Sequence, residues 1–130
     1  MFQKVQLIGN LGNDPEMRYS PSGKPVVNFS LATNEKWDGG ERTTWFRVSA
    51  WNGLAETLNK WLSKGDLIYL EGSLRADDET GGPRVWTCKD GEPRASFEIA
   101  ARTVKFLRTK GRDGEEAPEE YEPETDELPF

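Results

Sequence analysis

Residues 43–65 read TTWFRVSAWNGLAETLNKWLSKG, and the hydrophobic spacing of this stretch changes at Trp51. Up to that residue, successive side chains alternate between two faces with a period of two, which indicates a β-strand. From Leu54, large apolar side chains recur at i, i+4, i+7 and i+8 until Gly65, which indicates an amphipathic helix. The stretch therefore predicts a strand that leads directly into one helix.

The segments on either side of this stretch read as further strands separated by turn residues. Residues 5–11 and 25–37 precede it, and the second of these, PVVNFSLATNEKW, alternates cleanly between apolar and polar side chains. Residues 66–75, 84–88 and 94–107 follow the helix. Three strands, one helix and then more strands is the order of the five-stranded OB barrel.

We therefore predict an all-β fold, a five-stranded OB-fold barrel with one helix after the third strand. The barrel domain is expected to cover residues 1–108. Its interior is expected to contain Val48 and Ala50 from the central stretch, together with Phe29, Phe97 and Ile99.

The composition excludes several classes of protein. The chain has 130 residues, 35% of them hydrophobic, with one cysteine and no histidine. It therefore lacks the residues for a disulfide framework, a structural zinc site or histidine-dependent catalysis. No segment approaches the roughly 20 apolar residues of a membrane span, and the start lacks the apolar core of a secretory signal. We expect a cytoplasmic protein with no membrane, metal or cofactor.

The prospects for catalysis are poor. Cys88 has no predictable base nearby, and Asp77, Asp78 and Glu79 form at best a weak cation site. Both patterns are typical of solvated loop or strand residues. We therefore predict no catalytic residues and no enzyme activity.

The net charge of -6 is distributed unevenly along the chain. Residues 1–108 contain 15 Lys and Arg against 14 Asp and Glu, whereas residues 109–130 contain 2 against 9. The acidity therefore belongs to a tail, and the body of the chain can carry a basic groove on one side.

The tail over residues 109–130 has three prolines and few apolar side chains, so we expect it to be disordered. Its last five residues combine two acids, two large apolar side chains and a free carboxylate: Asp126, Glu127, Leu128, Pro129 and Phe130. A mobile acidic chain with an apolar tip suits a basic-rimmed hydrophobic pocket on a partner protein. The alternative is a tail that only increases solubility.

In the central strand the alternation of side chains leads to an unusual outer face. Phe46, Val48 and Ala50 share the side that we assign to the core. The opposite side carries large aromatic and basic groups: Trp45, Arg47, Ser49 and Trp51. Open indoles provide flat platforms for unpaired bases, and an arginine between them can reach a phosphate. The alternative is that these tryptophans pack beneath a loop or a partner subunit.

Two further tryptophans have basic neighbours along the chain. Trp37 follows Lys36 at the end of the preceding strand, and Trp86 lies between Arg84 and Lys89. Aromatic rings for base stacking next to cations for phosphates are the combination that proteins use to bind single strands.

Taken together, these segments resemble the bacterial single-stranded-DNA-binding protein (SSB) family. The resemblance covers VQLIGNLGNDPEMRYSPSGKPVVNFSLATNEKW, TTWFRVSAWNGLAETLNKWLSKGDLIYLEG, RVWTCKDGEPRASFEIAA and the tip DELPF, in the family's order. It implies a homotetramer of OB folds that binds single-stranded DNA without sequence preference. It also implies a C-terminal tip that recruits replication, recombination and repair proteins.

The resemblance also implies roles for individual residues. Trp37, Trp45 and Trp86 match the family's base-stacking tryptophans, and Trp51 stands where the family commonly has a stacking phenylalanine. The matching basic positions along the DNA backbone are Arg47, Lys64, Arg84 and Arg94.

Three features depart from the family's pattern. The loop ADDETGGP, residues 76–83, adds acidic residues near the expected DNA path, and Gly53 stands where the family often has a lysine. The tail also lacks a long glycine- and glutamine-rich linker. Two other functions remain open from the residues alone: an OB-fold RNA-binding module, which affinities for matched rA and dA oligomers would identify, and a protein-protein adaptor.

Overall fold

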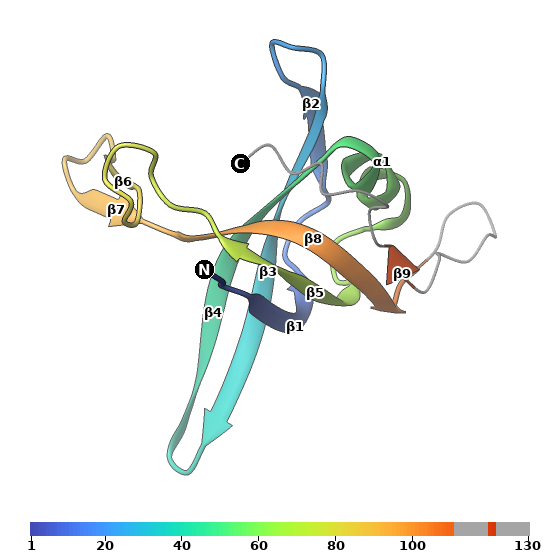
Figure 1. Ribbon diagram of the computed structural model, residues 1–130. Helices are drawn as coiled ribbons and strands as arrows, with labels where there is room; N and C mark the ends of the chain where they lie inside the picture. Colours follow the sequence, from blue (N-terminus) through green and yellow to red (C-terminus); the bar gives the residue numbers. More distant parts are fainter. Residues whose placement is uncertain (111–119, 122–130) are drawn as a thin grey trace.

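The computed structural model describes residues 1–110 and 120–121 of the chain (Figure 1). One helix and nine strands are assigned in these residues. In chain order they are β1 Val5–Leu11, β2 Glu16–Tyr19, β3 Pro25–Trp37, β4 Gly40–Trp51, α1 Asn52–Trp61, β5 Leu67–Leu74, β6 Val85–Thr87, β7 Pro93–Ala95, β8 Phe97–Arg108 and β9 Glu120–Tyr121.

Five of these strands close into a barrel. The sheet runs in the order β1-β5-β8-β4-β3, and β3 pairs back to β1 through Asn10 and Leu11. The β4–β8 pairing is parallel, whereas the other pairings in the barrel are antiparallel. Two register shifts between β5 and β8 bend the wall, and a side chain at Gly72 would overlap the carbonyl of Ala100 across the pair.

The alternation of β3 and β4 supplies the barrel interior. Val27, Leu31, Val48 and Ala50 are fully buried, and Phe29 is nearly so. These side chains form one cluster with residues of the other barrel strands and with three leucines around α1, namely Leu54, Leu58 and Leu62. Burial of this apolar surface is the main favourable contribution to folding, so period two in the strands and period 3.6 in the helix determine the architecture.

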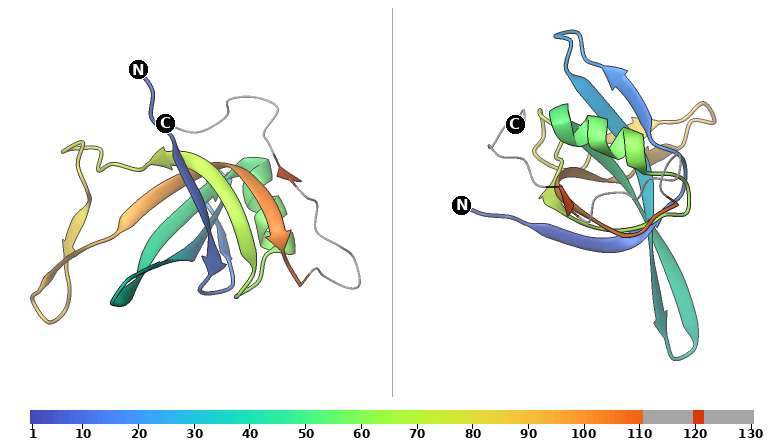
Figure 2. Two further views of the ribbon diagram at one scale, coloured as in Figure 1. Left: turned by 90° about the horizontal axis from the view of Figure 1, so that it is seen from below. Right: turned by 90° about the vertical axis from the view of Figure 1, so that its right-hand side faces the viewer.

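The change from strand to helix takes place at Trp51 and Asn52. Asn52 has a φ of 58°, in the left-handed region, which asparagine adopts more readily than most residues. This sharp turn directs α1 back over the barrel, where it packs against β2, β3 and β4 (Figure 2). It also fixes Trp51 at the corner between the two elements.

Among the hairpins that project from the barrel, two carry tryptophans (Figure 1). The first is the β3–β4 arm, residues 34–43, which extends past the barrel wall and is exposed along its whole length. The second is the β6–β7 arm, residues 84–95, a separate two-stranded sheet on the connection from β5 to β8. Both arms carry tryptophans, so the fold places aromatic side chains well away from the core.

The structure confirms the predicted fold class. Of the five barrel strands, β1, β3 and β4 precede the helix and β5 and β8 follow it. The short strand β2, which pairs with the beginning of β3, was not predicted, because EMRY is short and mostly polar. In the described residues no helix is both long and apolar enough to cross a membrane.

The structure contradicts one sequence-based expectation, the burial of Phe97, and describes only two residues of the segment over which a second, the disordered tail with its tip, extends. The placement of Phe97 in the interior was wrong: its side chain is 61% exposed, and its ring lies 5.8 Å, centroid to centroid, from that of half-buried Phe46. Phe97 starts β8 outside the closed part of the barrel, so alternation alone assigned it to the wrong environment. Most of the tail that we expected to be disordered, and its tip, lie outside the described residues, although Glu120 and Tyr121 pair with β8.

Candidate nucleic-acid interface

Trp45 and Arg47 lie on the outer face of the barrel wall, on the side that alternation assigns to them. Both side chains are exposed, and the Trp45 side chain retains 54% of its accessible surface. The residues opposite them on β3, Ala32 and Ser30, are small. Nothing bulky on β3 therefore covers this face, whereas on the other neighbouring strand, β8, Glu98 stands opposite Arg47.

The indole of Trp45 packs against the backbone of Gly12, just after β1. A β-carbon at Gly12 would overlap atoms of the six-membered ring of Trp45. The missing side chain therefore allows the ring to lie close to the backbone. Because the ring has this support and is still half exposed, its orientation is fixed before any ligand binds.

The loop that carries Lys64 lies close to this position. The backbone N–H of Gly65 donates to the carbonyl of Leu11 at 2.8 Å, and the N–H of Lys64 donates to the Asp14 carboxylate at 2.8 Å. These bonds tie the loop to the end of β1, next to Gly12. The exposed Lys64 side chain is thus a cation on the Trp45 side of the barrel.

Trp51 and Ser49 differ from the other residues on this face because they are partly covered. Ser49 is 7% exposed and Trp51 is half-buried. Cζ of Arg75 lies 5.0 Å from the Trp51 ring centroid, and Arg75 Nη1 donates to Ser49 Oγ at 3.4 Å. Ser49 Oγ in turn donates to Asn28 Oδ1 at 2.7 Å. This relay holds the guanidinium over the indole, beside a cleft of about 580 Å³ lined by both side chains.

Trp37 lies on the β3–β4 arm with 53% of its surface exposed. The register of the hairpin places it on the strand face opposite to that of Trp45. Cζ of Arg42 lies 5.5 Å from the Trp37 ring centroid, and Arg42 Nη2 donates to Glu35 Oε2 at 3.2 Å. We call Trp37, Arg42 and Glu35 the Trp37 triad. Lys36 is also exposed on this arm, on the other face.

Trp86 occupies the corresponding place on the β6–β7 arm and is 37% exposed. Cζ of Arg84 lies 5.9 Å from its ring centroid, and Arg84 Nη2 donates to Glu98 Oε1 at 3.0 Å. We call Trp86, Arg84 and Glu98 the Trp86 triad. Lys89 is exposed at the turn of the arm.

Arg94 pairs across the β6–β7 arm with Trp86 and makes an ion pair with Asp90 at 3.3 Å. Both side chains of this ion pair are more than half exposed, so solvent screens it and phosphate can compete for the arginine.

The acidic loop, residues 76–83, is closed by its own hydrogen bonds. The Asp77 N–H donates to the Gly82 carbonyl and the Gly81 N–H donates to the Asp77 carbonyl, both at 2.8 Å. The Asp77 carboxylate accepts the N–H groups of Glu79 and Thr80. Within residues 1–110 and 120–121, no group of three His, Cys, Asp or Glu side chains is arranged to bind a metal ion.

Both ends of the acidic loop are attached to Glu98. The Arg75 N–H donates to the Glu98 carbonyl at 2.8 Å, and the Arg84 guanidinium binds the Glu98 carboxylate. The partly covered Trp51 and the Trp86 arm are therefore joined through one residue of β8. Sequence reasoning missed Arg75, Arg42, Glu35 and Glu98, because their contacts depend on strand register and on loops that meet in space.

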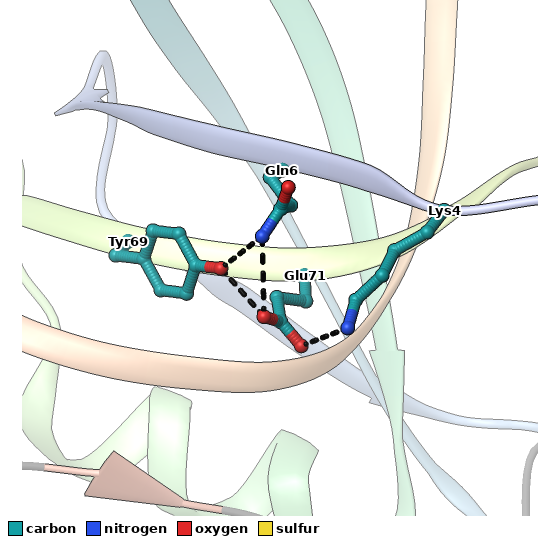
Figure 3. Close-up of polar contacts among 4 residues, drawn as sticks. All are labelled: Lys4, Gln6, Tyr69 and Glu71. Atoms are coloured by element: carbon teal, nitrogen blue, oxygen red, sulfur yellow. Dashed lines mark hydrogen bonds and ion pairs between the residues drawn. The ribbon is translucent and has the colours of Figure 1, made fainter.

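A second polar network joins Lys4 and Gln6, at the beginning of the chain, to Tyr69 and Glu71 of β5 (Figure 3). Glu71 accepts hydrogen bonds from Tyr69 and Gln6, and it makes an ion pair of 2.9 Å with Lys4. Hydrogen bonds from the Tyr69 hydroxyl and, with a smaller effect, from the Lys4 ammonium lower the pKa of Glu71 below its ordinary value. The hydrogen bond to Glu71 raises the pKa of Lys4. This network joins β1 to β5 in the barrel wall and contains none of the tryptophans.

The predicted tip residues, 126–130, lie outside the described part of the chain. The structure thus places the four candidate tryptophans and six candidate cations on the barrel face and the two arms. It joins Trp51 to the Trp86 arm, but it places Trp37 and Trp45 on opposite faces of their hairpin.

Comparison with known proteins gives consistent matches. The model of the Single-strand binding protein family matches residues 2–107. The chain is 40% identical over 124 residues to proteins named single-stranded DNA-binding protein from Neisseria meningitidis serogroups A and B, across 92% of this chain and 67% of each relative. It is 44% identical over 115 residues to single-stranded DNA-binding protein 1 of Xylella fastidiosa, across 84% of this chain and 79% of the relative.

Proposed function

The chain belongs to the Single-strand binding protein family, and from this premise we propose that it binds single-stranded DNA without sequence preference. The observation that carries the proposal is the exposure of three indoles, those of Trp37, Trp45 and Trp86, on the outside of a closed barrel. Exposed indoles beside cations are the flat platforms on which proteins that bind single strands stack unpaired bases. The proposed role is binding alone, with no catalytic residue, metal or cofactor.

Stacking is the proposed source of base recognition. Every base has an aromatic face, so stacking on an indole contributes roughly 1–3 kcal/mol per base whatever the sequence. The bases of a duplex already stack on one another and are not available. We assign this role to Trp37, Trp45 and Trp86, and also to Trp51, whose ring is held beside the cleft by Arg75.

Cations on the barrel wall and on the two arms, near these tryptophans, are the proposed contacts to the phosphate backbone. Six exposed side chains are assigned to this role: Lys36, Arg47, Lys64, Arg84, Lys89 and Arg94. Three of them, Lys36, Arg47 and Lys64, lie along β3, β4 and the loop beside Gly12, and the other three lie on the β6–β7 arm. A DNA strand that follows these positions would pass from the barrel wall, past Trp51, to the β6–β7 arm.

We further propose a homotetramer, which acts in the cytoplasm in replication, recombination and repair. One OB groove holds only about 4–16 nucleotides, and several grooves on one body increase avidity. The tip over residues 126–130 is proposed to recruit partner proteins of these processes, because it combines acidic and large apolar side chains. Family membership supports these assignments.

The proposal is tested by measuring the affinity for labelled oligo-dT and for a duplex of equal length over a salt series. We expect strong preference for the single strand. The logarithm of the binding constant should fall linearly with the logarithm of salt, by about 0.7 per phosphate neutralised. Equal affinity for the two forms of DNA, or no binding to either, would overturn the proposal.

A further inference from the structure

The Trp37 and Trp86 triads repeat one arrangement in two separate parts of the fold. In each, an arginine lies over the indole and is held there by a glutamate, with cation-to-centroid distances of 5.5 and 5.9 Å. The arginines bind their carboxylates at 3.2 and 3.0 Å. The two triads come from different hairpins, and only one of them involves the β8 strand. This repetition indicates that the arginine and glutamate act in the same way on both tryptophans.

A carboxylate beside a surface that binds DNA repels the phosphates, so its presence there calls for a physical reason. In the triads its task is to orient the arginine, whose long side chain would otherwise sample many rotamers. The same contact neutralises the guanidinium. A phosphate that binds this arginine therefore competes with the carboxylate for the charge of the guanidinium, and it has the full charge to itself only after the carboxylate has been displaced.

The two carboxylates differ in how strongly they compete. The Glu98 side chain is 13% exposed, whereas that of Glu35 is 62% exposed. Solvent and salt screen an exposed ion pair and weaken it. The backbone of Glu98 is also fixed, because its carbonyl accepts the N–H of Arg75 at the start of the acidic loop. Glu98 is therefore the stronger competitor.

We propose, resting on the proposed function, that Glu98 is a positioning residue that controls binding at the β6–β7 arm by exchange. In the free protein it holds Arg84 over the Trp86 ring. When a single strand binds, a phosphate takes over the guanidinium and a base takes its place on the indole. Glu35 does the same for Arg42 and Trp37, more weakly. At each triad, therefore, a phosphate replaces an internal carboxylate as the partner of the arginine, whereas Lys36 and Lys89 on the same arms would each bind a phosphate without such an exchange.

The exchange is tested with Glu98→Gln in the full chain, using labelled oligo-dT over a salt series. Removal of the carboxylate charge makes Arg84 an additional net cation, so the salt dependence should become steeper by about 0.7. Affinity at low salt should rise roughly 1.5- to 5-fold, which corresponds to the usual strength of a partly exposed ion pair. Glu35→Gln should change both quantities in the same direction by less.

Two comparisons separate the exchange from other effects of the substitution. Glu56→Gln removes the same charge from the exposed face of α1, away from both arms, and should not steepen the slope. The double variant Glu98→Gln with Arg84→Met should lose the gain in slope. A Glu98→Gln slope equal to that of Glu56→Gln, or weaker binding, would overturn the exchange.

A second variant keeps the test valid if Glu98→Gln does not fold. Arg84→Met should weaken binding, because the phosphate loses its partner on this arm, but it should reduce the slope by much less than about 0.7, because the exchange leaves no net gain of charge at this position. Lys89→Met, on the same arm, should reduce the slope by about 0.7. Equal reductions would overturn the exchange while leaving the proposed function intact. Failure of the unmodified chain to bind oligo-dT would overturn the proposed function as well.

Discussion

Trp45 illustrates how one residue can be prepared for binding before a ligand arrives. Its ring lies against the backbone of Gly12 and opposite the small side chain of Ala32, so one part is supported and the rest is open. An indole has only two side-chain torsions, and packing already limits them. Stacking of a base on this ring, as proposed above, would therefore cost little conformational entropy.

Replacement of Trp45 by alanine should weaken the binding of oligo-dT roughly 5- to 150-fold, because one stacked base contributes roughly 1–3 kcal/mol. The fold should persist, since 54% of the side chain is exposed and it lies outside the buried cluster. Trp45→Phe retains an aromatic face and should recover much of the loss. The measurement is an equilibrium titration, with a thermal unfolding curve of each variant as the control.

Gly12→Ala offers an independent check at the same position. The added β-carbon would overlap the ring, so the indole has to move although it is still present. We expect weaker binding of oligo-dT than in the unmodified chain. If Gly12→Ala and Trp45→Ala both bind as tightly as the unmodified chain, Trp45 does not belong to the interface.

At the scale of elements, the wall formed by β1 and β5 has one task and the two hairpin arms have another. The wall formed by β1 and β5 carries the Lys4–Glu71 network with Tyr69 and Gln6, which joins the two strands on their outer side. The arms carry tryptophans and lack a core of their own. Between this wall and the two arms, stability and the proposed binding are therefore largely separated, and substitutions in one should affect the other only weakly.

The Glu71 network predicts how stability depends on pH. Because the folded state lowers the pKa of Glu71 below its ordinary value of 4.5, its contribution is present above that pH. It is lost as the pH falls through the lowered pKa. Glu71→Gln should therefore reduce the melting temperature at neutral pH, and the difference from the unmodified chain should shrink as the pH is taken below 4.5.

Lys4 has the opposite sign. Its pKa is raised above the ordinary 10.5, so its contribution is present below that value and is lost only in strong alkali. Lys4 stays charged between neutral pH and acid. Melting temperatures of the unmodified chain and of Glu71→Gln over this range therefore report only the protonation of Glu71. A constant difference in melting temperature over this range would contradict the assignment.

The elements also show what sequence reasoning can and cannot provide. Alternation in β3 and β4 correctly predicted the buried Val48 and Ala50 and placed Trp45 on the opposite face, but it left open whether that face is covered. It failed at Phe97, because the rule of two faces holds only where the barrel wall is closed. It gave no sign of Arg75 over Trp51 or of Glu98 beneath Arg84, since these contacts join segments 24 and 14 residues apart that only the folded chain brings together.

At the scale of the whole molecule, charge is divided between a near-neutral body and an acidic end. The chain carries a net charge of -6, yet residues 1–108 have one more basic than acidic residue. Long-range attraction to DNA is therefore weak, and binding must rely on contacts at short range. In the function proposed above, indoles on the barrel face and on both arms would provide such contacts, together with the arginines of the two triads.

The central claim is that the exposed indoles contact unpaired bases, and tryptophan fluorescence of the full chain measures this most directly. Titration with long oligo-dT at two salt concentrations should quench the emission to a saturating limit, because stacked bases quench an indole. The midpoint should shift to higher DNA concentration at the higher salt. Emission that stays unquenched while labelled oligo-dT is shown to be bound would contradict the account.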